Sequence, residues 1–123
     1  IFCDLKRADP RVKAVVHWVQ ENFTLERHPG FMVGDAGDEP WQGLYYYYFS
    51  MARALSVYGQ HTWTTKAGIK HDWRRELASE LLSQQIDRGA FLNTRSPRWN
   101  GDAPVLCKIY GVLALGECLK ALD

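Results

Sequence analysis

The sequence lacks a charge excess of either sign and lacks a long hydrophobic run. It carries 15 Lys and Arg against 14 Asp and Glu, which gives a formal net charge of +1. A nearly neutral chain offers little electrostatic attraction to nucleic acid or to an anionic membrane surface, so we expect neither as a partner. No apolar run approaches the ~18 residues of a membrane-spanning helix, and we therefore expect no transmembrane segment.

Nothing at the start of the chain has the features of a targeting segment such as a signal peptide. The first residue is Ile1 rather than Met, which leaves open that an N-terminal segment was removed. The sequence therefore assigns the protein to no compartment.

Cysteine is scarce, and its three copies lie far apart in the sequence. Cys3, Cys107 and Cys118 form neither a Cys-x-x-Cys pair nor a zinc-ligand spacing, and their number is odd. Cys107 and Cys118 fall in an apolar stretch, where a free thiol behaves as a small hydrophobic side chain. We therefore expect reduced, structural cysteines, no metal site and no cofactor.

Four helical segments can be read from the sequence, two of them amphipathic and two apolar nearly all round. In the first, apolar residues recur at three- and four-residue spacing from Val12 to Phe23. Asp9 is placed to act as its N-cap, and Pro10 suits the first helical position. The amphipathic helices are predicted at about 9–26 and 72–86, and the apolar helices at 43–59 and 105–122.

The alternation of amphipathic and apolar helices predicts an all-α fold with residues 1–123 in one domain. Two stacked hairpins, residues 9–59 and 71–122, would each pair a half-solvated outer helix with a covered inner one. We expect no β-strand, and residues 60–70 are expected to form a polar loop that contains Trp63. Two hairpins leave two open ends with apolar surface, so we also expect either self-association or an arc whose ends are covered by the loops.

Four consecutive tyrosines, Tyr45 to Tyr48, dominate the first apolar helix. Successive helical residues turn by ~100°, so Tyr45 and Tyr48 share a face with Phe49 nearby, while Tyr46 and Tyr47 point elsewhere. Each buried hydroxyl needs a hydrogen-bond partner. Two interpretations stay open, a packed inner helix and the wall of an aromatic cavity.

The segment 81–91, which reads Leu-Leu-Ser-Gln-Gln-Ile-Asp-Arg-Gly-Ala-Phe, resembles the QW repeat of squalene–hopene cyclases and their relatives. Gln85, Gly89 and Phe91 match its Gln, Gly and aromatic positions. Phe91 replaces the usual Trp, and Arg88 replaces the usual Asp. In the repeat, the Gln bonds free backbone groups of the next helix, and the aromatic packs over the turn that Gly makes possible.

The resemblance extends over roughly residues 9–119, to bacterial proteins with the prenyltransferase and squalene-oxidase repeat. It is carried by Pro29–Gly30, Gly43–Tyr48, Ala52–Leu55, His71–Trp73 and Arg98–Pro104. The implied fold is part of an α/α toroid, which closes with about six hairpins. The sequence supplies two, so the implied partners include the remaining repeats as well as a second copy of the chain.

The catalytic signatures of that family are missing from this sequence. It has no Asp-x-Asp-Asp motif, with which the cyclases protonate an alkene, and the acidic cluster at 35–39 is interpreted as a solvated loop. It also has no Asp-rich helix for magnesium and no Asp-x-Cys spacing for zinc. A terpenoid-cyclase-like activity would therefore require further repeats.

The resemblance thus implies a terpenoid-cyclase- or prenyltransferase-like module without catalysis in this chain alone. Its implied partner is an apolar, isoprenoid-like small molecule. The residues expected to contact that ligand are Tyr45, Tyr48, Phe49, Trp99 and Asp102. The alternative is a helical-repeat module with a structural or protein–protein interaction role.

Overall fold

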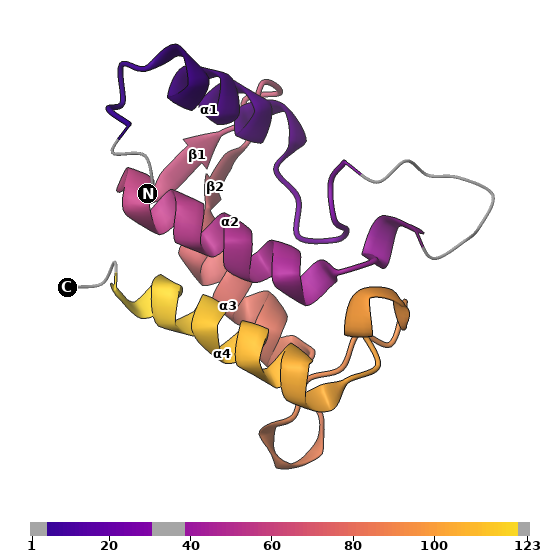
Figure 1. The fold of residues 1–123 in the computed structure, drawn as a ribbon. Helices are drawn as coiled ribbons and strands as arrows, with labels where there is room; N and C mark the ends of the chain where they lie inside the picture. The colour runs from indigo at the N-terminus through magenta and orange to yellow at the C-terminus, as the bar shows by residue number, and fades with distance from the viewer. Residues whose placement is uncertain (1–4, 31–38, 121–123) are drawn as a thin grey trace.

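A computed structural model describes residues 5–30 and 39–120 of the chain, and these residues form a mainly helical fold, as predicted (Figure 1). Cys3 and the acidic residues Asp35 and Asp38 lie outside this part. The main helices are α1 (Pro10–Asn22), α2 (Leu44–Tyr58), α3 (Trp73–Ser83) and α4 (Pro104–Lys120). The short elements are the strands β1 (Thr62–Thr64) and β2 (Lys70–Asp72), and the 3-10 turns Glu39–Trp41, Asp87–Gly89 and Arg98–Asn100.

The expectation of a polar loop and no β-strand at residues 60–70 is wrong. β1 and β2 form a small antiparallel hairpin in which Trp63 pairs with His71. β-Branched and aromatic residues favour strands, and Thr-Trp-Thr places Trp63 on the buried side while the threonines face away. The alternation covers three residues, too few to stand out from a loop in the sequence.

The ends of the helices follow the capping residues that the sequence offers. The Asp9 carboxylate accepts a hydrogen bond from the backbone N–H of Arg11 at 2.9 Å, and Pro10 opens α1. Asp72 accepts in the same way from the N–H of Arg75 at 3.3 Å, at the start of α3. α1 and α3 each end three or four residues earlier than the periodicity predicted.

The core lies where α2, α3 and α4 pack together. α2 lies along α4, and α3 passes behind both helices in Figure 1. Arg53 of α2 reaches Glu117 of α4 in an ion pair with an N–O distance of 2.9 Å. Buried side chains come from all three helices, from β1 and from the segment before α4: Leu44, Tyr45, Tyr47, Tyr48, Met51, Ala52, Leu55, Trp63, Trp73, Leu77, Leu81, Phe91, Cys107, Ala114 and Cys118.

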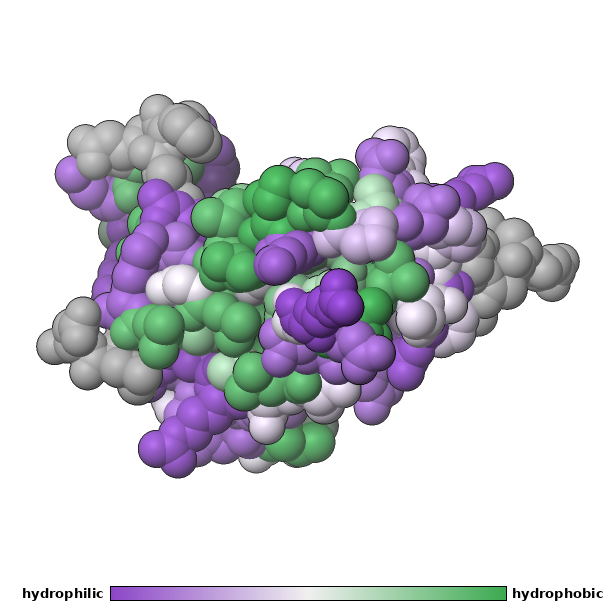
Figure 2. Space-filling view, turned by 90° about the horizontal axis from the view of Figure 1, so that it is seen from below, coloured by the Kyte–Doolittle hydropathy of each residue, from purple (hydrophilic) through white to green (hydrophobic). Residues whose placement is uncertain are grey.

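The outer face of α4 remains exposed to solvent and is apolar. Figure 2 shows hydrophobic side chains gathered on this underside of the molecule, with polar side chains between them. Five large aliphatic residues of α4 are between 45% and 73% exposed. We call them the α4 stripe: Val105, Ile109, Val112, Leu113 and Leu119.

α1 packs only partly against this core, through side chains such as Val16 and Val19. It contributes no buried residue, although its apolar face points at α2. Near its start, the Arg7 guanidinium bonds the carbonyl of Tyr58 at the end of α2. Beyond its other end, the carbonyls of Thr24 and Leu25 accept hydrogen bonds from tyrosines near the start of α2. The two helices therefore run antiparallel, and α1 is attached mainly by its ends.

Candidate ligand-binding groove

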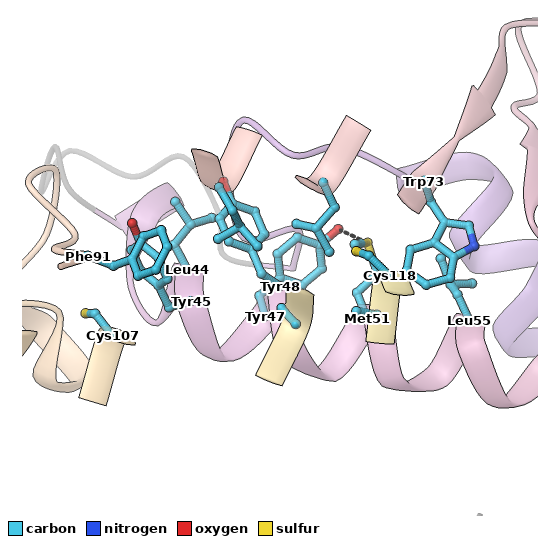
Figure 3. Close-up of a cluster of buried hydrophobic side chains, with 14 of the residues drawn as sticks. Leu44, Tyr45, Tyr47, Tyr48, Met51, Leu55, Trp73, Phe91, Cys107 and Cys118 are labelled. Carbon is cyan, nitrogen blue, oxygen red and sulfur yellow. Dashed lines mark hydrogen bonds between the residues drawn. The ribbon is translucent and has the colours of Figure 1, made fainter. Parts of the chain in front are cut away.

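Tyr45 and Tyr48 lie together, as the helical geometry predicted, but inside the core. Their rings meet edge to face with centroids 5.8 Å apart, and they are 3% and 0% exposed. The Tyr48 hydroxyl donates to the carbonyl of Leu25 at 2.6 Å. Figure 3 shows both rings among packed side chains, and burial raises the pKa of both hydroxyls. Each ring therefore acts as a core element with its polar tip satisfied.

The glutamine that bonds α2 is Gln84, next to the predicted Gln85. Gln84 Oε1 accepts from the Tyr45 hydroxyl at 3.0 Å, and its Nε2 donates to Glu80 at 2.5 Å. The same Nε2 lies 3.4 Å from the Tyr48 hydroxyl. Gln85 is exposed. The sequence contains both glutamines side by side, so only the helical register could have separated their roles.

Phe91 and Gly89 occupy the turn that follows α3. Gly89 has φ +73°, a left-handed conformation that glycine adopts without steric cost. Phe91 is 1% exposed and packs against Tyr45 with ring centroids 5.9 Å apart. Its ring also lies directly over Gly111 of α4, where an added Cβ would be 3.0 Å from Phe91 Cδ2. Gly111 is thus a packing partner that the sequence did not single out.

Phe49, Trp99 and Asp102 do not join the two buried tyrosines around one cavity. Phe49 is half-buried and stacks on Tyr110, with centroids 6.1 Å apart. Trp99 is 71% exposed with φ +56°, and Asp102 is exposed. The space that Trp99 and Tyr45 both border measures about 10 Å³, room for one water at most. The ligand-binding role of these residues stays a prediction.

The large apolar cavity of the described residues is a groove between α1 and α2, with a volume of about 660 Å³. α1 supplies one wall and α2 the other, and Trp63 of β1 contributes from the hairpin. We call it the α1–α2 groove. Its lining residues are Leu5, Arg7, Arg11, Val12, Val15, Val16, Trp18, Val19, Phe23, Tyr47, Met51, Ala54, Leu55, Val57, Tyr58 and Trp63.

The groove exists because α2 is apolar on two sides. One side packs on α4, and the other presents Tyr47, Met51, Leu55 and Tyr58 to α1. Their spacing of four, four and three residues places them on one helical face. That spacing is the signal in the sequence that could have revealed the groove. Across from them, Val15 of α1 is still 57% exposed because no residue fills the space between.

Tyr47 lines the far end of the groove, beside the end of α1. Its hydroxyl donates to the carbonyl of Thr24 at 2.8 Å, and its ring stacks on His28 with centroids 5.2 Å apart. Burial raises the pKa of Tyr47, so the hydroxyl stays protonated and continues to donate. With this polar atom engaged, Tyr47 presents its aromatic ring to the groove.

The other end carries two arginines. Arg7 donates to the carbonyl of Tyr58 at 2.5 Å, and its guanidinium carbon lies 4.9 Å from the centre of the Tyr58 ring. Arg11 forms a two-pronged bond with Asp9, with Nε–Oδ1 and Nη2–Oδ2 distances of 3.0 and 2.9 Å. The hydrogen bonds from Arg11 lower the pKa of Asp9. The groove therefore has one cationic mouth and one aromatic end.

The described part of the chain holds neither a cluster of metal-binding side chains nor an exposed thiol. Residues 5–30 and 39–120 contain no group of three His, Cys, Asp or Glu placed to hold a metal ion. Cys107 and Cys118 are free and buried, and burial raises the pKa of Cys118 to about 11, which makes it a poor nucleophile.

Among the helices of the described residues, none is long and apolar enough to cross a membrane.

Comparison with known proteins adds no relative to this picture. No known protein family, no curated protein and no solved structure matches the chain.

Proposed function

We propose that the protein is a non-catalytic helical module that binds an apolar, elongated small molecule in the α1–α2 groove. The observation that supports this proposal is a groove of about 660 Å³ with an apolar lining, beside a helix that buries none of its own residues. Small-molecule sites in proteins are concave, mostly apolar and typically ~300–1,000 Å³ in volume. The groove fits this description in size and in chemistry.

The isoprenoid-like ligand implied by the sequence resemblance is apolar and elongated, as the groove requires. A branched hydrocarbon chain matches a trough walled by valines on α1 and by aromatic and sulfur-containing side chains on α2. A second space of about 280 Å³ near the end of α1 is lined by charged and polar side chains such as Glu21 and Arg27, and it suits such a chain poorly. The proposal therefore assigns the ligand to the Tyr47 face of α2 and leaves Tyr45 and Tyr48 in the core.

The test is binding of N-phenyl-1-naphthylamine, a neutral apolar probe that fluoresces on leaving water, followed by its displacement with farnesol. Val15→Asp places a charge in the groove at a residue that is 57% exposed, so the fold should tolerate it. We expect it to weaken probe binding by about tenfold or more, because a carboxylate in the apolar lining disfavours an apolar ligand. Leu82→Asp is the matched control, since Leu82 is 60% exposed on α3 and lies outside the groove. Absence of probe binding, or equal binding by both variants, overturns the proposal.

A second candidate function, self-association, is favoured by the α4 stripe. Its residues recur at helical spacing on one exposed face, an arrangement typical of a helix that packs against another helix. Gly116 lies on the same helix with no atom within 4 Å of an added Cβ, so it leaves open space. In an antiparallel pair centred between Val112 and Leu113, Ile109 of one copy would face Gly116 of the other. A two-fold contact of this kind uses the same patch on both copies.

Sedimentation velocity over a concentration series tests this second function. We expect a dimer that Ile109→Glu dissociates, since the new charge would face the partner helix. Leu82→Glu serves as the control and should leave the dimer intact. A monomer at all concentrations contradicts the idea.

A further inference from the structure

The charges that line the α1–α2 groove are of one sign and lie at one end. Among its described lining residues Arg7 and Arg11 are cationic and none is anionic. Arg7 is bonded to the carbonyl of Tyr58, the last residue of α2, and Arg11 lies in the first turn of α1. Because the helices are antiparallel, both guanidinium groups sit at the same mouth of the groove.

The rest of the groove is apolar to its far end. At ~1.5 Å per residue, the 13 residues of α1 provide a wall of about 20 Å. The wall runs from the two arginines to Phe23, with Tyr47 and Met51 on the opposite side. A molecule that fits this arrangement along its length has a charged head and a single hydrocarbon tail.

Both guanidinium groups are held in place and keep hydrogen-bonding capacity. A guanidinium carries five N–H donors in a fork that matches the oxygens of carboxylates and phosphates. The side chain of Arg7 uses one of these donors on Tyr58, and that of Arg11 uses two on Asp9. Asp9 offsets one of the two positive charges, and the mouth keeps a net positive charge.

We infer that the ligand of the groove is a single-chain amphiphile with an anionic head, a carboxylate or a phosphate, bound at Arg7 and Arg11 with its tail running toward Phe23. This inference rests on the proposed function, because it names the class of molecule that the apolar groove takes. It adds that the arginine mouth selects for the charge of the head group.

The experiment displaces N-phenyl-1-naphthylamine from the full chain with four sixteen-carbon competitors, each kept below its aggregation concentration. They are hexadecanoate, hexadecyl phosphate, hexadecanol and hexadecyltrimethylammonium. We expect the better of the two anions to bind about tenfold more tightly than the alcohol, and the ammonium to bind more weakly than the alcohol. The ranking of the carboxylate against the phosphate then identifies which head group the mouth prefers.

Two variants separate recognition at the mouth from general attraction of charge. Arg11→Gln should remove most of the preference for anions, measured as the ratio of the anion affinity to the hexadecanol affinity of the same variant. Lys13→Gln removes the same charge from the same helix at a residue outside the groove lining, and should change the preference by less than about twofold, since exposed charges are screened. Arg7→Gln provides a second test at the other guanidinium.

The outcomes distinguish this inference from the proposed function. If the probe binds but alcohol and anions compete equally, the groove binds apolar molecules and the head-group inference is wrong. If Lys13→Gln lowers the preference as much as Arg11→Gln, the mouth does not recognise the head group and the inference also fails. If the probe does not bind at all, the proposed function itself fails.

Discussion

The side chain of Gln84 joins the end of α3 to the start of α2, because its Oε1 accepts a hydrogen bond from the hydroxyl of Tyr45 at 3.0 Å. Tyr45 is 3% exposed, so its hydroxyl has little access to water. Replacing Gln84 with Ala would leave a buried donor unsatisfied, which costs about 1–3 kcal/mol of unfolding free energy. Urea denaturation should detect this loss.

The adjacent Gln85 provides the control for that measurement. Its side chain is exposed, so Gln85→Ala should change the unfolding free energy by no more than about 0.5 kcal/mol. Equal losses for the two variants would contradict the role given to Gln84 and would favour the original QW-like assignment of Gln85.

Gly111 and Gly116 of α4 should respond oppositely to alanine. A Cβ on Gly111 would lie 3.0 Å from the ring of Phe91, so Gly111→Ala should overpack the core and destabilise it by about 1–3 kcal/mol. Gly116 has open space around its Cα, so Gly116→Ala should stabilise the helix by about 0.5–1 kcal/mol. Thermal unfolding of the two variants checks the signs, and a shift of both in one direction would refute the packing of Phe91 on Gly111.

Gly89 is required by the backbone of the turn before Phe91. It has φ +73°, and a β-branched residue in the left-handed region costs about 1–2 kcal/mol. Gly89→Val should therefore lower the melting temperature, whereas Gly89→Asn should lower it less, because Asn tolerates this region better. If valine and asparagine give the same melting temperature, the turn does not hold Gly89 in this conformation.

Glu117 should make the protein sensitive to acid. Burial alone would raise its pKa, but hydrogen bonds from Lys120, Ser56 and Arg53 outweigh burial and lower the pKa in the folded state. A group with a lowered folded pKa contributes stability above its unfolded pKa, and that stability is lost as the pH falls through the folded value. The loss should therefore occur as the pH falls below the usual pKa of a glutamate, about 4.3.

Glu117→Gln tests this acid sensitivity through melting temperatures measured from pH 7 down to pH 3. The variant should be less stable at neutral pH and should lose less stability on acidification than the native chain. Parallel curves for the two proteins would show that Glu117 does not titrate with unfolding in this range.

Much of the helical scaffold could be predicted because its signals are local. The carboxylates of Asp9 and Asp72 cap the helices that follow them, and the 100° turn per residue correctly separated Tyr45 and Tyr48 from Tyr46. Capping and periodicity act within a few residues, so a single sequence reveals them. The all-α class followed from these signals.

The parts that escaped prediction depend on how the elements pack against one another. The β1–β2 hairpin is held by burial of Trp63 against residues of α2, such as Tyr58, whose ring lies 5.6 Å away. The spacing of apolar residues on α2 indicates a second apolar face, but the groove also depends on how far α1 stands from α2, which that spacing does not encode. Gln84 bonds α2 in place of the predicted Gln85, and this difference of one residue depends on where α3 ends.

The attachment of α1 by its two ends links ligand binding to local unfolding. Release of α1 would break the Arg7–Tyr58 bond and the hydrogen bonds at Thr24 and Leu25, and α1 itself contributes no fully buried side chain. Regions with little buried apolar surface open at a small free-energy cost, and their amides exchange with deuterium early. A molecule that fills the groove would add the burial that α1 lacks. Amide exchange of α1 would therefore slow in proportion to occupancy, while exchange in α2, α3 and α4 would follow global unfolding.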